Sequence, residues 1–303
     1  MKKKIFCLFF LFTFINISFA QDWMDSFEVA KRLALTQNKM LFVMWEDAYR
    51  RPFPDFLEDD KGNLYFVKDI FNNEFINSKI WEYFVPVILK ESQHAILYNK
   101  IKGKRSLTYI NKFNDDFIKI MDVNGNILNI KGIEYKNFLE FLTMYALDTT
   151  FLTTELRNYS SKQDINTAFH LAVKYIDYAI YTNKKLRPEI IHLSSIYLDE
   201  AEQYLIKENP KNKNIILNRI EFYKIQQQIV LNNIRKAKRQ LKKFNDIEIN
   251  QINQPLYAFL NYSVYTLLND REAQEWKKQV RYSDLKKTGV LLNNTLNSSG
   301  KNN

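Results

Sequence analysis

The stretch FVMWEDAYRRPF, residues 42–53, sets the expected fold for the first half of this 303-residue chain. Together with Met40 and Leu41, its apolar part up to Trp45 has the length of a strand and no polar member. Such a run is typical of a strand buried on both faces. Charged residues and Pro52 follow directly, so we predict that the strand leads into an exposed turn.

Recognisable helices and strands surround this stretch. A helix capped by Asp25 or Ser26 should precede it, because apolar residues recur there at helical spacing as far as Asn38. After the turn we expect a polar loop at 58–63, which lacks the alternating ligands of a calcium loop. The later elements are predicted in this order: a helix through 73–77, a strand at 84–89, helical chain from 92 to 113 broken near Gly103, a strand at 117–121, an Asn124–Gly125 hairpin turn, a strand at 127–130, and a helix burying Phe138, Phe141, Leu142 and Tyr145.

This order, and several short motifs between residues 23 and 147, resemble secreted thioredoxin-like domains. Those domains have an Ala-containing helix, Asn- or Gly-Lys, an apolar strand, and then an aromatic residue followed by Cys-Gly-Pro-Cys. When the strands are aligned, Tyr49 falls at the aromatic residue, Arg50 and Phe53 at the two cysteines, Arg51 at the glycine and Pro52 at the proline. The segments 122–126 and 132–142 resemble the hairpin and last helix of the family.

The departures from that pattern imply that the redox chemistry is lost. Thiol–disulfide exchange needs a reactive thiolate and a second thiol that resolves the mixed disulfide, and neither Arg50 nor Phe53 supplies one. The substrate-holding cis-proline of the family aligns at or near Asp116, so the usual peptide clamp is missing as well. The turn is then either an ordinary exposed turn or a contact surface. In the second case Tyr49 and Phe53 would be anchors, and the two arginines would face an acidic partner.

The first twenty residues predict a cleaved secretory signal. Three lysines precede an apolar run from Ile5 to Ile17, and small residues at 18 and 20 precede a cleavage site before Gln21. An uncleaved anchor helix is the alternative, although the run is short for a membrane span. We expect a periplasmic or secreted protein with no transmembrane segment after cleavage. The only cysteine, Cys7, lies within the signal, so the mature chain would contain no thiol.

Charge and periodicity distinguish the second half. Residues 21–150 hold 17 Lys and Arg against 19 Asp and Glu, whereas residues 151–303 hold 24 against 15. Apolar residues recur at steps of four and three from Ile216 to Phe244, which predicts one long helix with Gln227 as its only polar seam position. Cations crowd the last turns of that helix. A helix dipole accounts for them, and contact with an anionic surface is the alternative: Arg235, Lys236, Arg239 and Lys243.

We therefore expect a signal peptide at 1–20, an α/β thioredoxin-like domain at 21–150, an all-α helical-hairpin domain at 151–290 and a disordered tail at 291–303. The helical hairpins resemble tetratricopeptide-like repeats weakly, and a plain helical bundle fits equally well. No phosphate loop, nucleophile elbow or metal-ligand spacing is present, so we expect no metal, cofactor or nucleic-acid partner.

The resulting hypothesis is a non-catalytic scaffold of a bacterial cell envelope that binds another envelope protein. Two alternatives remain. One is an enzyme of unknown class that uses carboxylates near the degenerate turn, at Glu46, Asp47, Asp115 and Asp116. The other is a thiol-independent periplasmic chaperone that binds extended chains through aromatic side chains.

Overall fold

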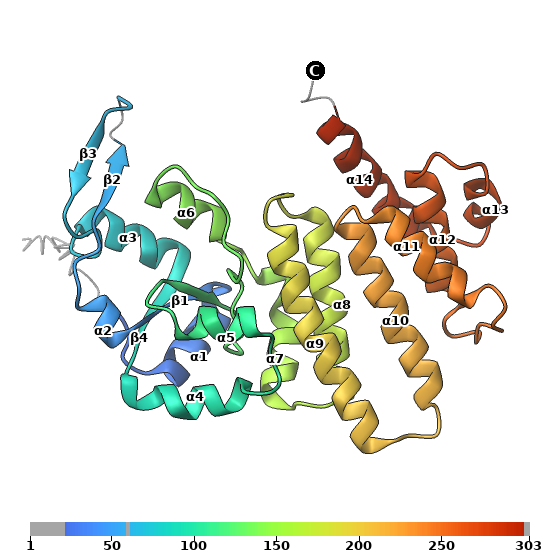
Figure 1. The fold of residues 1–303 in the computed structure, drawn as a ribbon, viewed down its shortest axis with the longest axis horizontal. Helices are drawn as coiled ribbons and strands as arrows, with labels where there is room; N and C mark the ends of the chain where they lie inside the picture. The colour runs from blue at the N-terminus through green and yellow to red at the C-terminus, as the bar shows by residue number, and fades with distance from the viewer. Residues whose placement is uncertain (1–21, 59–60, 300–303) are drawn as a thin grey trace, which may run out of the picture.

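A computed structural model describes residues 22–58 and 61–299, with side chains described as far as residue 293. The chain forms a small mixed α/β part followed by a helical region, and the two lie side by side (Figure 1). The predicted signal peptide, with Cys7, lies outside the described residues. No helix in the described ranges combines the length and the apolar character that a membrane crossing requires.

The centre of the α/β part is strand β1 (Met40–Trp45), all six residues of which are buried. It pairs in parallel with β4 (Phe84–Leu89) and antiparallel with β5 (Lys119–Met121), which gives the sheet order β4–β1–β5. The predicted bounds of the first two strands are confirmed. A strand with neighbours on both sides and helices over its faces has no polar position, which is why its sequence is continuously apolar.

Helices complete the α/β part in nearly the predicted places. Helix α1 (Phe27–Gln37) is capped by the Ser26 side chain and ends at Asn38 in the left-handed conformation. The helix predicted after Gly132 is α6 (Phe138–Tyr145), and its four predicted core residues are buried. The other helices are α3 (Glu74–Tyr83), 3-10 turn η1 (Glu91–Gln93), α4 (His94–Ile101) and α5 (Leu107–Asn114).

Two predictions for this part were wrong. The segment predicted as a polar loop lies within a two-stranded antiparallel ribbon, formed by β2 (Asp55–Glu58) and β3 (Leu64–Val67). The predicted returning strand at 127–130 is reduced to a single bridge between Met121 and Ile127. There the Asn129 side chain bonds to the backbone of Ile120 and Ile118 in place of a regular ladder.

The helical region packs as antiparallel neighbours beside the sheet, and α8 and α9 form its central pair (Figure 1). In the described part of residues 151–299 no strand occurs. Its elements are η2 (Thr150–Leu152), α7 (Thr153–Ser161), α8 (Ile165–Tyr181), α9 (Arg187–Glu208), α10 (Lys213–Val230), α11 (Ile234–Leu241), η3 (Lys242–Phe244), α12 (Gln254–Leu267), α13 (Ala273–Lys277) and α14 (Tyr282–Ser299).

The long helix predicted from 216 to 244 is divided. It breaks between α10 and α11, where Asn232 takes a positive φ of 62°. Asparagine tolerates that conformation, so the chain can turn while the apolar positions still reach the core. Gln227, the polar seam residue, is buried and bonded to Ser194 and Ser195 of α9. Helix α14 also extends to Ser299, so most of the predicted disordered tail is helical.

A buried carboxylate joins the two parts of the chain. Asp122, in the hairpin turn after β5, is fully buried and accepts hydrogen bonds from Tyr197 of α9 at 2.5 Å and Tyr175 of α8 at 3.3 Å. It also accepts from the backbone N–H groups of Asn124 and Asn126 at 2.9 and 3.0 Å. Burial raises the pKa of the Asp122 carboxyl, and these four donors compensate part of the desolvation.

Removing this carboxylate should uncouple the two parts. We expect Asp122→Ala to lower the free energy of unfolding by about 3 kcal/mol, because it leaves several buried donors unpaired, whereas Tyr175→Phe should cost about 1 kcal/mol. Urea titrations would follow tryptophan fluorescence, which reports mainly on the α/β part through Trp23, Trp45 and Trp81, and far-UV circular dichroism, which reports mainly on the helices.

In Asp122→Ala we expect the two signals to change at different urea concentrations. The matched control is Tyr181→Phe, in which the altered tyrosine is 60% exposed, and it should leave both midpoints unchanged. A variant Asp122→Ala that unfolds at the wild-type midpoint would show that the carboxylate does not hold the parts together.

Candidate functional site

The degenerate turn follows β1 as a four-residue helix, α2 (Glu46–Tyr49), and a bend through Arg50–Pro52. The structure brings the aligned position Asp116 to this turn, because an Arg51 guanidinium nitrogen lies 3.1 Å from its carboxylate. Arg50 lies 2.5 Å from Glu46 one helical turn earlier. Both arginines thus already face a carboxylate of the same chain, and the turn carries no unbalanced positive charge.

The two aromatic residues of the turn pack inward. Tyr49 is half-buried, with its ring centroid 4.7 Å from that of Trp23, and Phe53 lies 5.3 Å from Phe71. Phe71 in turn lies 6.0 Å from Phe138 of α6. Aromatic pairs at these distances stabilise a core beyond the area that they bury. Tyr49 and Phe53 therefore hold the turn onto the core and leave only their outer edges for any partner.

The carboxylates near the turn are occupied too. Asp115 receives Lys112 and Lys119 at 3.1 Å each, and Glu46 and Asp116 receive the two arginines. Asp47 is exposed on the outer side of α2. In the described part of the chain, no group of three or more His, Cys, Asp or Glu side chains could hold a metal ion. The geometry thus brings together paired charges, with no two free carboxylates for acid–base chemistry.

Lys119 is the residue of this region that the sequence analysis missed. Its side chain is fully buried, and its amine lies 2.6 Å from the Asp115 carbonyl oxygen and 2.8 Å from that of Phe117. Burial lowers the pKa of Lys119 to about 8, and the Asp115 carboxylate acts in the opposite direction. The lysine thereby holds the loop that carries Asp116 beside the turn. A lone lysine in a strand gives no sequence signal for this role.

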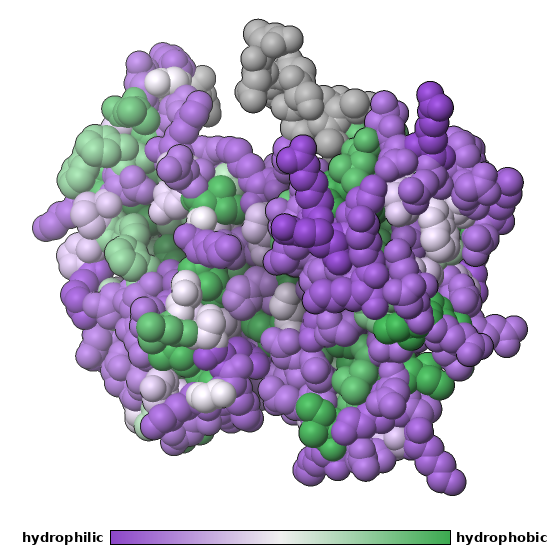
Figure 2. Space-filling model, turned by 45° about the vertical axis from the view of Figure 1, so that its right-hand side comes forward, coloured by the Kyte–Doolittle hydropathy of each residue, from purple (hydrophilic) through white to green (hydrophobic). Residues whose placement is uncertain are grey.

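The β2–β3 ribbon begins two residues after Phe53 and extends away from the body of the α/β part (Figure 1). Phe56 pairs with Phe66 across the ribbon, and their ring centroids are 5.6 Å apart. The side chains of Phe56, Leu64, Tyr65 and Phe66 are 53, 64, 44 and 60% exposed. Figure 2 shows hydrophobic surface at its upper left, where the ribbon lies. Only Leu57 of the ribbon is buried, beside α6.

The ribbon could have been found in the sequence. Residues 55–58 and 64–67 are two short runs rich in apolar residues, separated by the polar DDKGN segment with a glycine, which is the pattern of a hairpin. The acidic residues of the segment drew attention to metal binding instead. The ribbon is also a departure from the thioredoxin-like pattern, so the resemblance did not suggest it.

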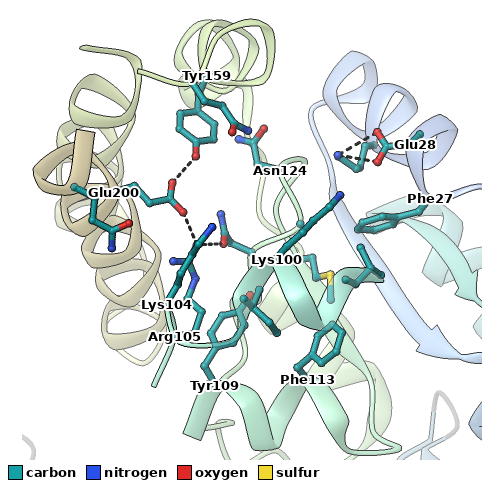
Figure 3. A pocket seen from close by; sticks show the side chains of 18 of the residues that line it. Phe27, Glu28, Lys100, Lys104, Arg105, Tyr109, Phe113, Asn124, Tyr159 and Glu200 are labelled. Atoms are coloured by element: carbon teal, nitrogen blue, oxygen red, sulfur yellow. Dashed lines mark hydrogen bonds and ion pairs between the residues drawn. The ribbon is translucent and has the colours of Figure 1, made fainter. Parts of the chain in front are cut away.

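A separate cavity of about 480 Å³ lies between the α/β part and the helical region (Figure 3). Since β1 and β5 are antiparallel, the hairpin turn that lines this cavity lies at the opposite end of β1 from the degenerate turn. One wall is apolar, with Phe27 of α1 and Phe113 of α5. The other wall is polar, with Tyr159 of α7 and Glu200 of α9.

The charges of the cavity are only partly paired. Figure 3 shows the Glu200 carboxylate between Tyr159 and Arg105, and it accepts hydrogen bonds from both. Lys31 lies 3.2 Å from Glu28. The other two cations, Lys100 at the end of α4 and Lys104 after it, have no ion-pair partner among the described residues.

The predicted basic residues are exposed on a short helix. Arg235, Lys236 and Arg239 lie on α11 and Lys243 on η3, and none of them has an ion-pair partner in the described ranges. Lys238 on the same helix pairs with Asp270 at 3.0 Å. The buried face of α11 carries Ile234, Ala237 and Leu241, so the cations lie on its solvent face, as the helix-dipole interpretation predicts for a solvated helix end.

No protein-family model, curated protein or solved structure matches this chain.

The burial of Lys119 makes a specific prediction about pH. Because its pKa is about 8 in the folded chain and 10.5 in the reference state, the unfolded chain binds the extra proton between these values, so stability from this group rises with pH in that window. Relative to Lys119→Met, the wild-type free energy of unfolding should therefore increase by up to ~3 kcal/mol from pH 8 to 10.5. Urea titrations of both proteins at matched pH measure the difference. Other titrating groups cancel in it, and a difference that stays constant with pH would refute the lowered pKa.

Proposed function

We propose that this chain is a non-catalytic scaffold of a bacterial cell envelope, in which a thioredoxin-like unit binds a partner protein and the helical region supports it. The parallel β1–β4 pair, the antiparallel β5, the hairpin turn and the closing helix α6 support the thioredoxin-like assignment. The signal-peptide pattern of residues 1–20 supports the envelope location. The assignment allows for a short α2 and an inserted ribbon where the family has its long active-site helix.

The residues of the turn support a loss of catalysis. No cysteine occurs after Cys7, so residues 22–303 have no thiol for disulfide exchange. The positions that align with the two cysteines are an arginine paired with Glu46 and a phenylalanine packed against Phe71. At the cis-proline position Asp116 is paired with Arg51, and Lys119 fixes the loop. Each reactive position has thus become part of a stabilising contact.

The exposed aromatic ribbon is the observation that carries the binding function. A two-stranded ribbon gains little stability by itself, and natural proteins usually protect strand edges and apolar strand faces from water. Here the outer edges of β2 and β3 pair with no other described strand, and Phe56 and Phe66 lie on a face open to solvent. The fitting partner is an extended, apolar segment of another protein, which would add a strand to an edge and cover the aromatic side chains.

Photo-cross-linking tests this contact. With a photoreactive residue at Phe66, expressed in cells of the source organism, we expect one predominant cross-linked partner. The matched control is the same residue at Leu107, which is 75% exposed but lies on α5 away from the ribbon, and it should not capture that partner. Phe56→Ser and Leu64→Ser should reduce the yield at position 66 by about tenfold if apolar contacts supply the affinity.

The other outcomes contradict the proposal in distinct ways. Capture of many unrelated chains would indicate the chaperone alternative, and capture of a second copy of this chain would indicate a ribbon-mediated dimer. Equal capture from positions 66 and 107 would show that the ribbon has no special role.

The loss of redox chemistry has its own test. Residues 21–303 should not accelerate the reduction of insulin by dithiothreitol above the rate without protein, because no thiolate is available to form the mixed disulfide. A thioredoxin assayed at the same concentration is the positive control. Acceleration by the purified chain would overturn the non-catalytic assignment, whatever the result of the cross-linking.

A further inference from the structure

We propose that the cavity between the two parts of the chain binds a small amphiphilic anion, with its carboxylate or phosphate head at Lys100 and Lys104 and its apolar body against Phe27 and Phe113. This site lies at the opposite end of β1 from the ribbon and is independent of the partner contact. Its volume of about 480 Å³ lies within the range of small-molecule sites in proteins.

The shape of the cavity depends on several elements that meet only in the folded chain. Helix α1 and helices α4 and α5 supply one side, the hairpin turn at Asn124–Asn126 supplies the base, and α7 and α9 supply the other side. The Asp122 carboxylate fixes the turn, and Asn126 also contacts Tyr197 and Arg105. Such a preorganised cleft between two packed units is a common place for a ligand, because little must be ordered on binding.

The chemistry of the lining selects the charge of the ligand. Its ionised side chains are four cations and two carboxylates: Lys31, Lys100, Lys104, Arg105, Glu28 and Glu200. Glu28 pairs with Lys31 and Glu200 with Arg105, which leaves the two remaining lysines without a counter-charge. Both project from one turn at the end of α4, four residues apart, and can approach a single anionic head from the same side.

The interior selects the body of the ligand. Phe27, Phe113 and Met121 are buried side chains that line the apolar wall, and Leu97 and Ile101 of α4 extend it towards the lysines. Gly125 belongs to the same lining, and a methyl group at its position would lie 3.3 Å from the Phe27 ring. A wholly polar anion would leave this wall in contact with water, whereas an aliphatic or aromatic body would cover it. Charge and apolar wall together therefore favour an amphiphile.

A series of probes with one chain length tests the assignment. Octanoate and octyl phosphate should bind, as measured by isothermal titration calorimetry with residues 21–303, and the tighter of the two identifies the preferred head group. Octanol, which has the same apolar body and no charge, should bind at least about tenfold more weakly. Equal binding of octanol, or no binding of either anion below millimolar concentrations, would overturn the proposal.

A variant pair locates the head group. Lys100→Gln together with Lys104→Gln should weaken binding of the tighter anion by about tenfold. Lys184→Gln together with Lys185→Gln is the matched control, because these neighbouring lysines are also exposed and unpaired but lie between α8 and α9 outside the cavity lining. The control should bind as the wild type does. Equal weakening in both double variants would show a general charge effect and would contradict a site.

Amine labelling gives a readout that needs no variant. Bound anion should protect Lys100 and Lys104 from acetylation, as seen by mass spectrometry of peptides, and should leave Lys184 and Lys185 fully reactive. Binding without this protection would place the ligand elsewhere and would refute the assignment to this cavity.

Discussion

The structure depends on the burial of Asp122. A carboxylate withdrawn from water without a cation is costly, and the chain offsets that cost with donors from three segments that are far apart in sequence. Two backbone N–H groups of the hairpin turn, the Tyr175 hydroxyl of α8 and the Tyr197 hydroxyl of α9 converge on its two oxygens. The α/β part and the helical region must therefore assemble in one relative position, because any other would leave the charge unsatisfied.

The same constraint organises the surfaces at the two ends of β1. The hairpin turn that Asp122 fixes forms the base of the cavity, so the shape of that cavity depends on the docking of α8 and α9. At the other end the helical region is far away, and the chain closes the sheet with local contacts instead. There Tyr49, Phe53 and Phe71 cover the strand ends with aromatic rings, and the ribbon extends from this layer into solvent.

Sequence patterns predicted the elements that are specified by their own residues. β1 and β4 have the expected bounds because a strand buried on both faces must be apolar throughout, and α1 begins where the Ser26 side chain can cap it. The patterns failed where tertiary contacts decide. The heptad spacing through Ile234 persists across a real break at Asn232, since both α10 and α11 present their apolar residues to the same core. Neither the cavity nor the role of Asp122 has a local signal, because their residues come from separate segments.

The arrangement around the degenerate turn explains why the redox site is unlikely to be one substitution away from activity. A thioredoxin site needs a free thiolate at the start of a long helix and an open backbone beside it. Here α2 has only four residues, and the two aligned positions make contacts with Glu46 and Phe71. Opposite them the Lys119 amine holds two carbonyl oxygens of the loop that a clamped peptide would need to approach. Restoring cysteines alone would leave these contacts in place. The turn has become a stable support for the ribbon, and binding is the property that this architecture favours.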